Sequence, residues 1–180
     1  MPYIPKSVID HIQQTILPMK VETCGYILLS DSGEVMLQTA ASGKIDSVRP
    51  NCVLPHLANY TWHSHFIGAK SYPSAEDILR VMKKRSNKLE QSKLELIFTR
   101  WGIWNITSLY KDAFQDIPRE LEYLTEKGNT IYHACKGAKT DFYDITAIND
   151  VISRIMKHYD KLVLNITFTP WTEIQGDYKY

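Results

Sequence analysis

The feature that most constrains this chain is a pair of histidines two residues apart, followed by a helix-start pattern. Trp62-His63-Ser64-His65 is separated by eight residues from Ser74-Ala75-Glu76-Asp77. The first segment is rich in aromatic and β-preferring residues and predicts a short strand, on which His63 and His65 point to one face. The second predicts a helix with Asp77 in its first turn. A passage from strand to helix at this spacing can bring the Asp77 carboxylate back to the two imidazoles.

Two imidazoles and one carboxylate are a typical ligand set for catalytic zinc, because the fourth position stays open to water. The sequence thus predicts one Zn²⁺ per chain, held by His63, His65 and Asp77. Each part has an ordinary alternative. His-x-His alone is more often two hydrogen-bonded or exposed histidines, and Ser74-x-x-Asp77 alone is more often a capping box. Together at this spacing they should occur by chance in roughly a few chains per thousand.

The surrounding pattern predicts an α/β protein with one sheet flanked by helices. A first helix is expected over Ser7–Leu17, capped by Ser7 and ended by Pro18. Hairpin signals lie at Asp31-Ser32-Gly33 and Trp101-Gly102. Strands are expected over 23–29, 34–39, 59–64, 94–99, 103–109, 130–135 and 162–169. Further helices are expected over 74–89, between a cap at Asp116 and Gly128 just past the end, and over 145–159. Residues 44–54 fit a strand or a loop.

Composition excludes several classes of function. The chain has 180 residues, 44% of them hydrophobic, which suits one compact domain. With 21 basic and 20 acidic residues, no charge excess favours nucleic acid or a membrane surface as partner. No apolar run approaches the ~20 residues of a spanning helix, and the start lacks a signal-peptide pattern. The three cysteines are scattered, which favours reduced thiols and a cytoplasmic location.

A third segment, Glu22-Thr23-Cys24-Gly25-Tyr26-Ile27-Leu28, completes a familiar pattern. Together with the His-x-His and Ser-x-x-Asp motifs, it resembles the JAMM (MPN-plus) zinc metalloproteases. The sequence of this segment is most similar to that of deubiquitinases of the AMSH type. The resemblance covers roughly residues 7–110. It implies the MPN fold, a mixed curved sheet flanked by helices and related to cytidine deaminases. Residues 1–112 would be the catalytic core, and the helices and strands of 113–180 would complete the same domain.

The resemblance also implies a role for each motif residue. His63, His65 and Asp77 would bind zinc, and Glu22 would be the general base that passes a proton from water to the leaving amine. Ser74 would hydrogen-bond the oxyanion. The implied reaction is hydrolysis of an isopeptide or peptide bond after the tail of ubiquitin or a ubiquitin-like protein. An activating or assembly partner is also expected.

The chain departs from the family pattern in three places. The spacer between the motifs is one residue longer than usual, and Phe66 replaces a common proline. Only 16 residues separate Asp77 from Leu94, too few for the insertion that clamps a ubiquitin tail. Two alternatives therefore stay open: a JAMM protease with a non-ubiquitin substrate, and a non-catalytic MPN scaffold. The scaffold is disfavoured because all five motif positions are intact.

Overall fold

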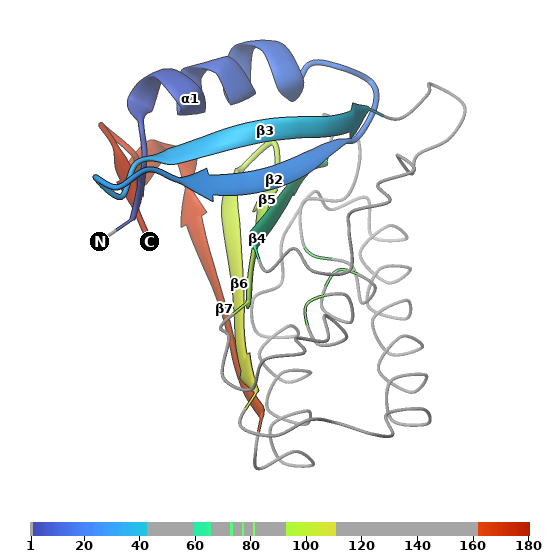
Figure 1. Ribbon diagram of the computed structural model, residues 1–180. Coiled ribbons are helices and arrows are strands. Elements are labelled where there is room, and N and C mark those ends of the chain that lie inside the picture. The colour runs from blue at the N-terminus through green and yellow to red at the C-terminus, as the bar shows by residue number, and fades with distance from the viewer. Residues whose placement is uncertain are drawn as a thin grey trace.

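The computed structural model describes residues 2–42, 60–65, 93–110 and 162–180, together with Pro73, Asp77 and Val81. This part of the chain is mixed α/β, with few helices and one mixed sheet of six strands (Figure 1). The strands of this sheet, in spatial order, are β3 (Val35–Ser42), β2 (Thr23–Leu29), β4 (Tyr60–Ser64), β5 (Lys93–Phe98), β6 (Gly102–Tyr110) and β7 (Leu162–Pro170). The fold class expected from the sequence is confirmed at this level.

One pair of strands sets the topology of the sheet. All neighbouring strands are antiparallel except β4 and β5, which pair in parallel with His63 opposite Ile97. Parallel neighbours cannot be joined by a tight turn and need a crossover connection. The segment between β4 and β5 is that crossover, and it contains Asp77.

The predicted strands agree closely with the observed ones. β2 has the predicted bounds; β4 to β7 differ by one residue at one or both ends, and β3 starts one residue later and ends three later. The first hairpin turns at Gly33, whose φ of 85° is readily adopted by glycine. Asp77 and Val81, from the predicted helix 74–89, are helical. Four predicted segments lie outside the described residues: 44–54, 116–128, 130–135 and 145–159.

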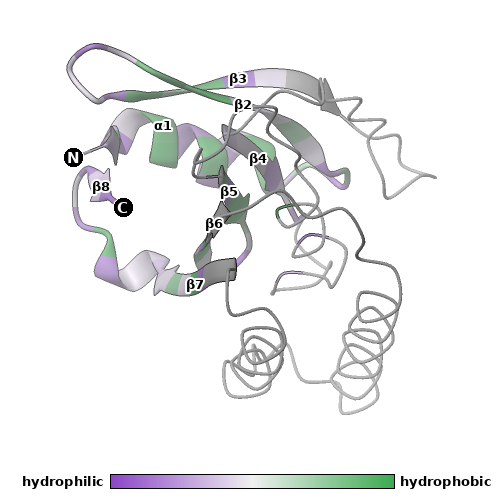
Figure 2. Cartoon of the chain, turned by 60° about the horizontal axis from the view of Figure 1, so that its bottom comes forward, coloured by the Kyte–Doolittle hydropathy of each residue, from purple (hydrophilic) through white to green (hydrophobic). Residues whose placement is uncertain are grey.

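The helical segment near the N-terminus packs on one face of the sheet. It consists of α1 (Lys6–His11) and a π-helical turn (Ile12–Ile16). Figure 2 shows the strands following an arc from β3 to β7, with α1 on its inner side. Ile9, Ile12 and Ile16 form a buried cluster with apolar side chains of that face, among them Trp62, Leu96 and Phe98. Since side chains alternate, the residues between these on β4 and β5 point to the opposite face.

The start of the helix differs from the prediction. Ser7 is not the cap, because the helix begins at Lys6 and Pro5 precedes it without a side-chain cap. The exposed N–H of Lys6 instead donates to Asp177 Oδ1 at 2.9 Å. This contact lies next to a small second sheet of β1 (Tyr3–Ile4) and β8 (Tyr178–Lys179) that was not predicted. No helix among the described residues has the length and apolar character needed to cross a bilayer.

The expectation of reduced thiols is wrong for Cys24. Its sulfur is part of a disulfide. Disulfides require Cβ atoms about 3.5–4.5 Å apart in space, a condition that the number and spacing of cysteines do not encode. Cys24 therefore gives no support to a reducing compartment, and a cytoplasmic location stays a prediction.

Gly25 fixes how closely β2 approaches its two neighbours. A Cβ atom at this position would lie 1.8 Å from the Gln38 carbonyl oxygen on β3 and 2.8 Å from Trp62 Nε1 on β4. The register with β3 also shifts between Cys24 and Gly25, as in a β-bulge. The glycine thus permits the tight contact of β2 with β4 that brings the first residues of β2 alongside the histidines.

Candidate metal centre

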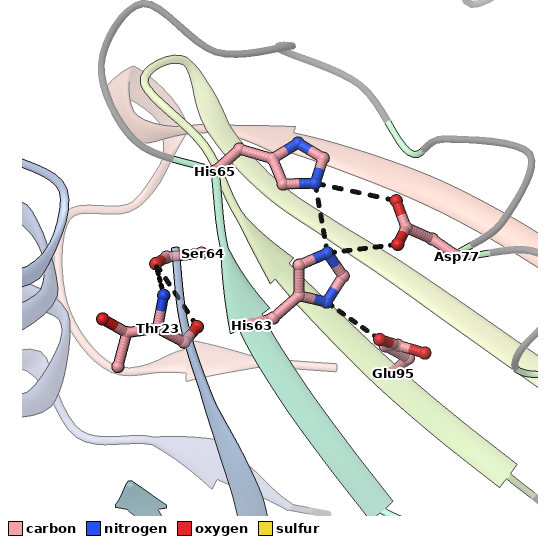
Figure 3. A network of polar contacts seen from close by, with 6 residues as sticks. All are labelled: Thr23, His63, Ser64, His65, Asp77 and Glu95. Carbon is pink, nitrogen blue, oxygen red and sulfur yellow. Dashed lines mark hydrogen bonds and ion pairs between the residues drawn. The ribbon is translucent and has the colours of Figure 1, made fainter. Parts of the chain in front are cut away.

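Three side chains converge at the C-terminal end of β4 (Figure 3). His63 Nε2 lies 3.1 Å from His65 Nε2 and 3.4 Å from Asp77 Oδ1. His65 Nε2 lies 3.6 Å from Asp77 Oδ2. One ligand atom from each residue falls within 4.8 Å of the others, and all three residues are buried. The structure therefore brings together the three residues that the sequence predicted as ligands.

The spacing of these atoms fits a metal ion. In tetrahedral coordination, bonds of about 2.0–2.2 Å to nitrogen and oxygen separate the ligand atoms by about 3.3–3.6 Å. The His63–His65 contact of 3.1 Å and the contacts of 3.4 and 3.6 Å from each histidine to its nearer Asp77 oxygen lie in or close to that range, although these two contacts involve different oxygens of the carboxylate. Imidazole nitrogens and a carboxylate oxygen are also suitable donors for a divalent transition metal. The group could hold one metal ion.

Two strands hold the histidines in place. His63 and His65 share a face because one residue separates them, and the backbone N–H of His65 donates to the Phe98 carbonyl at 2.8 Å. Ser64, between them, points the other way. Its Oγ accepts from the Thr23 N–H at 3.0 Å and donates to the Thr23 carbonyl at 3.4 Å. The end of β4 is thus fixed to β5 on one side and to β2 on the other.

Asp77 reaches the histidines from the crossover. It is helical and 3% exposed. Val81, one helical turn later on the same side, is fully buried. That face of the helix is therefore turned inward, and the carboxylate returns to the imidazoles as the sequence predicted.

Of the two residues predicted to act on the substrate, the structure describes only Glu22. Glu22 directly precedes β2 and is half-buried. Cys24 pairs with His63 in the antiparallel register of β2 and β4, so two further residues place Glu22 opposite His65. Its role as general base stays a prediction. Ser74 lies outside the described residues, and its role also stays a prediction.

One residue of this site was missed by the sequence analysis. Glu95 on β5 is fully buried, and its Oε1 lies 2.8 Å from His63 Nδ1. The available signal was a single acidic residue within the otherwise apolar run Leu94–Phe98. A charge in such a strand needs a buried partner, because an isolated carboxylate is costly to bury.

The site is strongly charged internally. Burial lowers the pKa of His63, but attraction and hydrogen bonding by Asp77 and Glu95 outweigh it and raise the pKa from 6.5 to about 9. Burial raises the pKa of Asp77, but His63 and His65 outweigh it and hold that pKa well below its usual range. Without a metal, the cluster at neutral pH therefore contains an imidazolium and a carboxylate. A metal ion would have to displace the proton of His63.

This proton predicts how the stability of metal-free protein depends on pH. The folded state binds the His63 proton more tightly than the unfolded state, so this stabilisation is complete below pH 6.5 and is lost as pH rises through about 9. Its size is on the order of 3 kcal/mol. Urea unfolding of chelator-treated protein from pH 6 to 9 should show this decline. The lowered pKa of Asp77 stabilises the folded state at neutral pH, and this stabilisation is lost only as the pH falls into the acid range.

Two variants isolate the contribution of His63. His63→Gln should flatten the decline between pH 6.5 and 9, whereas His11→Gln, a change at an exposed histidine, should follow the unmodified protein. A stability that stays level or rises with pH over this interval in metal-free protein would contradict the assigned proton.

Comparisons with protein-family models, with curated proteins and with solved structures found no match to this chain.

Proposed function

We propose that this protein is a zinc-dependent hydrolase of the JAMM type, with an MPN fold. It would cleave an isopeptide or peptide bond after the tail of ubiquitin or a ubiquitin-like protein. The observation that carries the proposal is the convergence of His63, His65 and Asp77 at the end of β4. That end lies beside the start of β2, where the sequence has Glu22.

The arrangement of elements supports the proposed fold. A helix and a hairpin whose first strand directly follows Glu22 precede the His-x-His strand, and a helical aspartate and a second hairpin follow it. This order is the one that the resemblance implies for residues 7–110. The mixed sheet is curved, as the resemblance implies, and α1 lies on its inner side (Figure 2).

Different residues of the chain would bind the metal, transfer the proton and stabilise the oxyanion. When bound, zinc would polarise the scissile carbonyl and make water more acidic. His63, His65 and Asp77 would hold it in a buried setting, where electrostatic interactions are stronger than in water. Glu22 is outside this ligand group, as a general base requires. Its carboxylate would accept a proton from the attacking water and deliver it to the leaving amine. Ser74 would donate to the developing oxyanion.

The short crossover bears on how a substrate is held. In the proposed family an extended tail binds as an added strand, and main-chain hydrogen bonds supply much of the affinity. A tail held on one side only should bind weakly, and poor placement of the reacting carbonyl is costly in rate. With 16 residues between Asp77 and Leu94, the chain has no room for a tail-clamping insertion at this place.

We therefore expect slow cleavage of ubiquitin chains without strong linkage preference. The measurement is a panel of linear and branched di-ubiquitins incubated with zinc-loaded protein, with products resolved over hours. A chelator should stop the reaction, and re-added zinc should restore it. Addition of a partner protein that supplies the second side of the tail site should raise the rate.

Four outcomes would contradict parts of this proposal. Fast, linkage-selective cleavage by the isolated chain would mean that it contains a complete ubiquitin site. No cleavage of any di-ubiquitin by zinc-loaded protein would overturn the ubiquitin substrate. Hydrolysis of an unrelated peptide in its place would favour the alternative JAMM protease. Zinc binding with no hydrolysis at all would favour the scaffold.

A further inference from the structure

A buried carboxylate stands behind the candidate metal centre. Glu95 is fully buried on β5, a strand otherwise made of apolar residues apart from Lys93 at its start. Its Oε1 lies 2.8 Å from His63 Nδ1, the ring nitrogen on the far side from Asp77 (Figure 3). Burial of a carboxylate in such a place is costly unless a strong partner compensates for it. His63 is such a partner.

The sheet register explains the contact. In the parallel pair β4–β5, Glu95 lies opposite Thr61, two residues before His63. Residues two apart share a face, so Glu95 and His63 point to the same side and meet diagonally. The imidazole is therefore held at both nitrogens, with Nδ1 toward Glu95 and Nε2 toward His65 and Asp77.

This arrangement selects one tautomer of neutral His63. A carboxylate can only accept, so Nδ1 must carry the proton that Glu95 receives as a hydrogen bond. Nε2 then presents its lone pair to the position between His65 and Asp77. Glu95 is not itself one of the grouped ligand residues, and the imidazole ring lies between its carboxylate and Asp77.

We propose that Glu95 is a positioning residue of the metal site, which fixes the ring of His63 and the tautomer that binds through Nε2. The inference rests on the proposed metal centre and adds to it a residue that the motifs do not contain. A carboxylate on the second ring nitrogen also makes the imidazole a stronger donor. Loss of such a partner typically costs about 10–100-fold in metal affinity.

Two substitutions separate the hydrogen bond from the charge. Glu95→Met has similar volume and no acceptor, so zinc affinity measured against a competing chelator should fall about 10–100-fold. Glu95→Gln keeps an acceptor oxygen without the charge and should show an intermediate loss. Glu173→Gln, the same change at an exposed site, should bind zinc as the unmodified protein does.

A second measurement is independent of both affinity and catalysis. Proton–nitrogen correlation spectra of zinc-loaded protein should contain a downfield Nδ1–H signal, assigned by its loss in His63→Ala. This signal should disappear in Glu95→Met and shift upfield in Glu95→Gln, because a neutral acceptor makes a weaker hydrogen bond. If Glu95→Met fails to fold, the zinc affinity and the Nδ1–H signal of folded Glu95→Gln still test the role of Glu95.

The results distinguish this inference from the proposed function. Unchanged zinc affinity and an unchanged Nδ1–H signal in folded Glu95→Gln would overturn the role of Glu95, even in an active hydrolase. Failure of the unmodified protein to bind zinc would overturn the metal site and this inference together. Zinc binding with the expected Glu95 effects but no hydrolysis would contradict only the proposed reaction.

Discussion

His63→Ala or Asp77→Ala should remove essentially all zinc from a protein that otherwise carries about one zinc ion per chain. The three ligand atoms lie within 4.8 Å of one another, and loss of one leaves two donors in a site built for three. Zinc content after purification and dialysis, measured by elemental analysis, provides the test. Asp77→Asn should also bind poorly, because a neutral amide replaces the charged donor while the shape is kept.

A matched control is available for this experiment. Asp31→Ala changes an exposed aspartate in the first hairpin and should leave zinc content unchanged. Zinc retained at the level of the unmodified protein after loss of Asp77 would show that the ion is held elsewhere. Freshly purified unmodified protein without zinc would contradict the catalytic proposal as a whole.

Glu22→Gln should reduce the rate of hydrolysis at least about 10²-fold while zinc content stays the same. The amide keeps the shape of the side chain but cannot accept the proton of the attacking water. Because Glu22 is not one of the three grouped ligands, the variant should separate proton transfer from metal binding. The measurement combines single-turnover cleavage of di-ubiquitin with zinc analysis of the same preparation.

Glu34→Gln is the control for this variant. Glu34 is half-buried, as Glu22 is, but it lies at the other end of the β2–β3 hairpin. The Glu34→Gln variant should cleave di-ubiquitin at the rate of the unmodified protein. If Glu22→Gln did so too, another group would be the base. If Glu22→Gln lost its zinc, Glu22 would be a ligand.

Much of the sheet could be predicted because its strands have a local signature. β2 has the predicted bounds, and the alternation across Trp62-His63-Ser64-His65 correctly separates a core side from a ligand side. The return of Asp77 also followed from local rules, since only eight residues separate His65 from Ser74, the expected start of the helix. Short-range periodicity was sufficient for these features.

Other features depend on contacts between distant residues. β1 and β8 have two residues each, too few to show any period, and they pair only because the fold brings the two segments together. The same proximity places Asp177 at the helix start in place of the expected Ser7 cap. The apolar run around Glu95 indicates a buried charge, but the partner of that charge is known only once β5 lies in parallel beside β4 and His63. The disulfide of Cys24 has no local signal.

The parallel pair β4–β5 has a consequence for how metal binding is coupled to folding. Two ligands lie on one strand of the pair and the third lies on the crossover that joins them, so a bound ion would tie the crossover to the sheet. Closing a connection of this length costs entropy before its contacts form. An ion at 100 times its dissociation constant offsets about 2.7 kcal/mol of such a cost. A bound ion would then couple the stability of the folded sheet to the return of Asp77 to the end of β4.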